Sequence, residues 1–154
     1  MHTSRESITH MRYITLLLCL AVGCAQPFGP SHHEYTTSTG IEVRANGAAP
    51  AQTDFDSAVS RSSKYAQGSL DGLMVVFTSD GWSVRKHCYE PEDKPLGYGG
   101  CYKPSSDSVL VEYRDSWEFV LIHELTHVRL DRYAQDPDAN HLGNVWEEIM
   151  SKEF

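Results

Sequence analysis

The 154-residue chain is poor in basic residues, and this scarcity excludes one large class of function. It contains 13 Lys and Arg against 21 Asp and Glu, which gives a formal net charge of −8. Nucleic-acid binding needs clustered cationic side chains that neutralise phosphates. The sequence shows no such cluster, so we expect no nucleic-acid partner.

Cysteine is also scarce, and the four cysteines do not have the spacing of a zinc finger. Cys88 and Cys101 have no second pair of ligands at that spacing. In an oxidising compartment two such cysteines form a structural disulfide. The chain-entropy model assigns on the order of 3 kcal/mol to a cross-link that closes a loop of about 14 residues. We therefore predict a disulfide between Cys88 and Cys101.

An apolar run near the N-terminus is too short to span a bilayer as a mature helix. It covers residues 14–22, follows Arg12 and ends in small residues. A basic residue, a short apolar run and small residues in this order indicate a secretory signal. Met11 fits the start of that signal better than the polar residues 1–10 do, and we predict a signal peptide over 1–23.

The end of the signal resembles the lipobox of bacterial lipoproteins, because Ala-Val-Gly stands directly before Cys24. This resemblance implies cleavage before Cys24, acylation of that cysteine and a lipid anchor in the bacterial membrane. Ala25 at the next position resembles outer-membrane sorting in Gram-negative bacteria. The alternative is an ordinary signal peptide cut nearby. Residues 24–40 are rich in Pro, Ser, Thr and Gly and predict a flexible tether, which leaves 41–154 as the folded domain.

The folded part contains separate helical and strand patterns. We expect a helix from Thr53 to about Gly68, strands at 73–78, 82–88 and 108–113, a helix over about 117–132, and a last helix over about 139–152. A short strand at 41–44 is expected at a sheet edge, and 89–107 is expected to be a loop pinned by the disulfide. Because helices and strands do not alternate regularly, these elements predict an α+β domain.

Two histidines in the helix expected over about 117–132 have metal-ligand spacing. His123 and His127 lie four residues apart, so they project from one helix face about one turn apart. This spacing lets both imidazoles reach one Zn²⁺ at about 2.0–2.1 Å. Glu124 is displaced around the helix, so it can hold a water molecule at the metal and accept its proton. We predict a zinc site.

The segment His-Glu-Leu-Thr-His at 123–127 resembles the signature of the zincin metallopeptidases, His-Glu-x-x-His on a helix behind a sheet. The match covers five residues, within an apolar helix that follows a predicted strand. It implies a zinc-dependent metalloendopeptidase with a peptide or protein substrate and with Glu124 as general base. The strand at 108–113 is expected to pair with that substrate. The alternatives are a non-catalytic lipoprotein with a structural zinc and a metal scavenger.

The third metal ligand must come from outside this segment. In the metzincin group a Gly and a third His follow it, and here Leu130 and Tyr133 hold those positions, which excludes that group. In the gluzincin group a Glu follows on a later helix, as Glu147 does here. At about 100° per residue, Glu147 points away from the apolar face of the last helix, whereas His141 and Glu148 flank it. We favour His141, with Glu148 and Glu147 as alternatives.

Three further residues have weaker assignments. Asp131 is a candidate ligand, as in aspzincin-like sites, or a hydrogen-bond partner of an imidazole; a salt link is the simpler role. Tyr133 and Tyr113 carry hydroxyl groups of the kind that stabilise an oxyanion. Tyrosine is frequent in this chain, with 8 residues, so neither is assigned that role.

Overall fold

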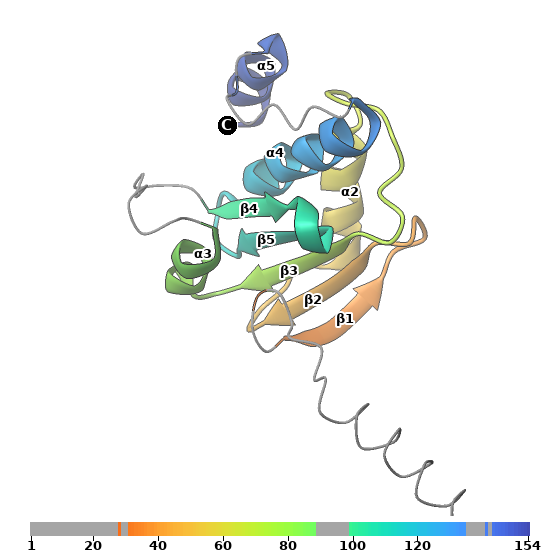
Figure 1. The fold of residues 1–154 in the computed structure, drawn as a ribbon. Helices are drawn as coiled ribbons and strands as arrows, with labels where there is room; N and C mark the ends of the chain where they lie inside the picture. Colours follow the sequence, from red (N-terminus) through yellow and green to blue (C-terminus); the bar gives the residue numbers. More distant parts are fainter. Residues whose placement is uncertain (1–27, 29–30, 89–98, 135–140, 142) are drawn as a thin grey trace, which may run out of the picture.

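The fold is a five-stranded mixed sheet with helices on both faces, seen in a computed structural model (Figure 1) that describes residues 28, 31–88, 99–134, 141 and 143–154. The elements are β1 (His32–Thr36), β2 (Glu42–Asn46), α2 (Gln52–Ser62), β3 (Met74–Thr78), α3 (Gly81–Cys88), β4 (Gly100–Lys103), the 3-10 helix η1 (Pro104–Ser106), β5 (Ser108–Glu112), α4 (Trp117–Arg129), the π-helical turn η2 (Leu130–Ala134) and α5 (Asn144–Glu153). The predicted α+β class is confirmed. The predicted signal peptide and Cys24 lie outside the described residues.

The sheet has the strand order β1-β2-β3-β5-β4. The three central strands are parallel, and the two edge strands pair antiparallel to their neighbours. Side chains alternate between two cores: Val75 and Phe77 pack with the helices α2 and α4, whereas Val76 packs with the residues around α3. Burial on both faces explains why β3 and β5 are almost continuously apolar rather than alternating.

The face that carries the candidate site is covered in two layers (Figure 1). The helices α2 and α4 lie on the sheet, and α5 packs against α4 on the side away from the strands. Trp146 and Ile149 attach α5 to the main core. Because α4 is covered on both sides, its apolar residues extend around most of its circumference, as the sequence indicated.

The N-terminal boundary of the folded part differs from the prediction. The flexible tether was expected to include 24–40, yet His32–Thr36 forms the edge strand β1 and pairs with β2. The strand expected at the edge at 41–44 is β2, which runs from Glu42 to Asn46 and is internal. The prediction failed because the polar residues of β1 are mostly exposed, so this edge strand carries no apolar alternation.

The segment 82–88 is helix α3 rather than the predicted second strand. Parallel pairing of β3 with β5 requires a crossover between them, and α3 begins this crossover and places Val84 in the second core. A further strand, β4, lies within the predicted loop 89–107. The described sheet has five strands, whereas the sequence predicted four, one of which is the helix α3.

The strand β5 corresponds to the prediction at 108–113 but is not at the sheet edge. It lies between β3 and β4, so both of its hydrogen-bonding edges are occupied and it cannot pair with a substrate. The edge at this side of the sheet belongs to β4. The expectation of substrate pairing at 108–113 was therefore wrong, because the sequence did not reveal a strand outside it.

The predicted disulfide between Cys88 and Cys101 is confirmed, with a Cα–Cα distance of 5.5 Å. It joins the end of α3 to the middle of β4 across the second core. Such a bond persists in oxidising compartments and indicates an extracytoplasmic protein. Among the described residues, no helix combines the length and the apolar composition needed to cross a bilayer.

Candidate metal centre

The helix α4 carries two of the three histidines of the site. Its residues Leu121, Ile122 and Leu125 are fully buried in the core, and this packing fixes the rotation of the helix. His123 and His127 are consequently held on the partly exposed side, one turn apart, with ring centroids 5.0 Å apart. The sequence predicted this pair from its spacing, and the structure brings the two rings together.

The third histidine, His141, reaches the other two from the segment before α5. Its backbone has a left-handed conformation, with φ 53°, and the predicted last helix starts only at Asn144. The Nε2 atom of His141 lies 3.0 Å from that of His123 and 3.0 Å from that of His127. The Nε2 atoms of His123 and His127 are 3.3 Å apart. Three ring nitrogens therefore converge on one point.

This convergence fits a metal ion. A tetrahedral ion with bonds of about 2.0–2.1 Å holds two nitrogen ligands about 3.3 Å apart, close to the three separations observed. Burial, with His127 and His141 nearby, lowers the pKa of His123 to about 3. Its imidazole is therefore neutral at physiological pH, which is the form that binds metals. The three histidines form a group that can bind a metal ion.

The alternative ligands are not part of this group. Within the described residues, the group of potential metal ligands at this position consists of the three histidines alone. Glu148 forms an ion pair with Lys152, one turn further along α5, and Glu147 is exposed. His141, the ligand that the sequence favoured, is the one that joins the group, but it does so from the segment before α5 and not through helical phasing.

Glu124 is the buried acid beside these histidines, with only 6% of its surface exposed. Burial raises the pKa of its carboxyl group to about 8. A hydrogen bond donated by the backbone N–H of Tyr102 acts in the opposite direction and lowers this pKa. Glu124 and His123 both line a cavity of about 550 Å³. A carboxyl group with a raised pKa in such a cavity is suited to proton transfer near neutral pH.

The start of β4 forms the opposite wall of this cavity. Gly99 and Gly100 both line it, and a Cβ atom at Gly100 would lie 2.5 Å from the backbone oxygen of Leu110 and 2.7 Å from the side chain of Val120. Only glycine fits between the sheet and α4 here. This close approach brings β4 near Glu124, and the sequence contained no signal for it beyond two adjacent glycines.

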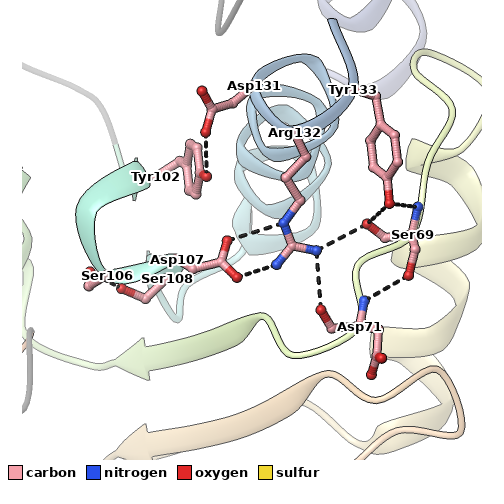
Figure 2. A network of polar contacts seen from close by, with 9 residues as sticks. All are labelled: Ser69, Asp71, Tyr102, Ser106, Asp107, Ser108, Asp131, Arg132 and Tyr133. Atoms are coloured by element: carbon pink, nitrogen blue, oxygen red, sulfur yellow. Dashed lines mark hydrogen bonds and ion pairs between the residues drawn. The ribbon is translucent and has the colours of Figure 1, made fainter. Parts of the chain in front are cut away.

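Asp131 and Tyr133, which the sequence placed near the motif, belong to a separate polar network (Figure 2). The hydroxyl of Tyr102 donates a hydrogen bond to Asp131 over 2.8 Å. The hydroxyl of Tyr133 interacts with the backbone of Ser69, and Arg132 pairs with Asp107. These contacts fix the turn η2 at the end of α4. They give Asp131 and Tyr133 roles outside the histidine group.

We expect the stability of the metal-free protein to depend on pH in both directions. The unfolded chain protonates His123 near its ordinary pKa of 6.5, whereas the folded chain does so only near 3; the free energy of unfolding should therefore fall as the pH drops through this range. The unfolded chain ionises Glu124 near 4.5, whereas the folded chain does so near 8, so stability should also fall as the pH rises to 8. Between pH 4.5 and 6.5, the ordinary pKa values of the two groups, their effects on the free energy of unfolding oppose each other.

Urea unfolding in the presence of a chelator, across about pH 4 to 9, measures this profile. A Glu124→Gln variant cannot ionise at this position, so it should keep its stability between neutral pH and pH 8 while retaining the loss in acid. Parallel declines of the variant and the unaltered chain on the alkaline side would show that Glu124 is not the responsible group.

In comparisons with protein-family models, with curated proteins and with solved structures, nothing matches this chain. The function of the chain therefore has to be inferred from its own residues. Two histidines in His-x-x-x-His spacing on α4 and a third before α5 are consistent with a zincin-like site. The geometry therefore gives this chain a group of three histidines that can bind a metal ion.

Proposed function

We propose that this chain is an exported zinc metallopeptidase, anchored by lipid through Cys24 at the bacterial membrane. The observation that carries the proposal is the convergence of three Nε2 atoms, 3.0–3.3 Å apart, beside a buried glutamate that lines a cavity together with His123. His123, His127 and His141 would hold the ion. Three imidazole ligands with one position left for water match catalytic rather than structural zinc sites.

Glu124 is the general base of the proposed reaction. When bound, zinc polarises a peptide carbonyl, lowers the pKa of water towards 7, and through its charge favours the carboxylate form of a neighbouring acid. The carboxylate of Glu124 accepts a proton from the attacking water and transfers it to the leaving amine. The N–H of Tyr102 donates to this carboxyl group and orients it.

The edge strand β4 supports a peptide or protein as the substrate. It is the last strand of the sheet, and within the described residues no strand pairs with its outer edge. An extended peptide can add to such an edge through backbone hydrogen bonds. Phe119, Val120 and Met150 give the adjoining cavity an apolar lining, which is suited to a large apolar side chain of the substrate.

The rival proposal is a non-catalytic lipoprotein with a structural or scavenging zinc. Two features favour catalysis over it. A structural ion is usually enclosed by four protein ligands, whereas the described group offers three. Glu124 is buried beside the cavity, and a purely structural site has no use for a buried acid that does not bind the ion.

Zinc content and hydrolysis, measured on the same preparation, test the proposal. The chain, purified without a polyhistidine tag, should contain one zinc ion and should cleave an unstructured protein such as casein. Chelation should abolish cleavage while the circular dichroism spectrum is largely kept, and added zinc should restore cleavage. Bound zinc without cleavage of any peptide tested would favour the structural or scavenging role, particularly if chelation unfolds the domain.

A further inference from the structure

Trp146 lies against all three histidines of the candidate site. The centroid of its ring is 4.7 Å from that of His123, 4.3 Å from that of His127 and 4.6 Å from that of His141. The three imidazole centroids are themselves 4.9–5.0 Å apart. Trp146 is buried, with 4% of its surface exposed.

These distances place the indole on one side of the histidine triangle. A point almost equally distant from the three corners of a nearly equilateral triangle lies close to the axis through its centre. An ion bound equally by three nitrogen atoms lies on the axis of the smaller triangle that the Nε2 atoms form between these rings. The indole ring offers no lone pair to a metal, so it covers one face of the triangle without contributing a ligand.

A cavity lies beside the histidines, at His123 and Glu124. Its other lining residues come from the start of β4, the segment before α4, α4 itself and the end of α5, and Trp146 is not among them. A fourth ligand can therefore approach from the cavity, whereas Trp146 occupies the space behind the histidines. An ion in this position has room for three nitrogen ligands and one more.

The position of Trp146 is fixed by contacts at the far end of its helix. Glu153 accepts a hydrogen bond from the hydroxyl of Tyr65 over 2.7 Å and pairs with Arg61 over 3.0 Å. Ile149, between these contacts and the indole, is fully buried. The helix α5 is therefore attached to α2 independently of any metal, and it presents Trp146 to the histidines before an ion binds.

We propose that Trp146 is a positioning residue that restricts the bound ion to four-coordinate geometry. This inference rests on the proposed metal site, though not on its catalytic activity. By closing one face, the indole favours divalent ions that accept tetrahedral coordination, such as Zn²⁺ and Co²⁺, over Mg²⁺ and Mn²⁺, which prefer six ligands. It also holds the three imidazoles together by packing, which pre-organises the ligands.

Substitution of cobalt for zinc tests this role by spectroscopy. Tetrahedral Co²⁺ absorbs visible light strongly, and five- or six-coordinate Co²⁺ absorbs weakly. We expect the unaltered chain and W146F, which keeps an aromatic cover, to give the strong spectrum. W146A should give a weaker spectrum, bind zinc about 10–100-fold less tightly, as when a supporting outer-shell partner is lost, and discriminate less between Zn²⁺ and Mn²⁺.

Trp117 provides the matched control. It is a buried tryptophan of the same core that packs on Phe77 and Tyr113, so W117A creates a comparable core defect elsewhere. It should leave the cobalt spectrum unchanged.

An unaltered cobalt spectrum and metal preference in folded W146A would overturn the inference, and so would a chain that binds no metal. Cobalt binding with the expected spectra but without hydrolysis would support it while rejecting the proposed peptidase.

A second measurement applies if W146A does not fold. Because the indole contacts the ligating rings, zinc binding should change the tryptophan fluorescence of the unaltered chain. In W146F this change should be lost. Competition with a chromophoric chelator should show that zinc still binds to this variant. Equal fluorescence changes in both proteins would show that Trp146 does not sense the ion and would contradict its assigned position.

Discussion

Replacing Glu124 by glutamine is expected to lower the rate of peptide hydrolysis by about 10²- to 10⁴-fold, the range that general acid–base catalysis contributes, while zinc stays bound. The three histidines that would hold the ion are unchanged, so metal content should stay at one per chain. Glutamine has the same shape as glutamate and still accepts the hydrogen bond from the N–H of Tyr102, but it cannot accept the proton of water. Zinc analysis and kcat/KM on one preparation check both halves of this expectation.

Glu118 supplies a control for this substitution. It lies on the same helix, is about half exposed and pairs with Arg61, away from the proposed reaction. E118Q should therefore keep both zinc and activity, since exposed ion pairs contribute little to stability. Full hydrolysis by zinc-loaded E124Q would disprove the assigned role of Glu124, and with it the proposed mechanism.

Replacing His141 by glycine is expected to weaken zinc binding by more than about 100-fold, because even the loss of a supporting outer-shell group costs about 10–100-fold. Glycine is chosen because His141 has a left-handed backbone, with φ 53°, which glycine adopts without strain. His141 is exposed, so the metal-free variant should unfold at the same urea concentration as the unaltered chain. Competition with a zinc chelator gives the affinity, and circular dichroism gives the stability.

The two glutamates that the sequence left as alternative ligands serve as controls. E147Q and E148Q should bind zinc as tightly as the unaltered chain, because neither carboxylate belongs to the histidine group. If H141G kept its affinity and either glutamine variant lost it, the third ligand would be the glutamate. The experiment thus distinguishes among His141, Glu147 and Glu148 as the third ligand.

Local sequence patterns predicted the parts of the site that lie on one element. His123, Glu124 and His127 are within one apolar helix, so their relative directions follow from the helical repeat. The cysteine pair predicted the disulfide because few other pairings were possible. The α+β class followed from the separation of helical and strand patterns.

The predictions that were wrong concern elements whose structure depends on contacts between distant segments. The segment of α3 has only a weak local pattern, and its helical conformation follows from the crossover between β3 and β5. The strands β1 and β4 lie at sheet edges, where little apolar burial marks them. The contact of Trp146 with the histidines could not be predicted, because it depends on how α5 packs on α4.

Three consecutive residues of β4 serve three different purposes, and this makes the pairing register of one short strand critical. Gly100 lines the cavity, Cys101 is bonded to Cys88, and the N–H of Tyr102 donates to Glu124. A slip by one residue would turn each side chain to the other face of the sheet, and a slip that moved Cys101 into the position of Gly100 would put a Cβ atom where none fits. Because Cys101 pairs with Leu110 and is covalently held by α3, the cross-link locks this edge strand against slippage at the position where the site depends on it.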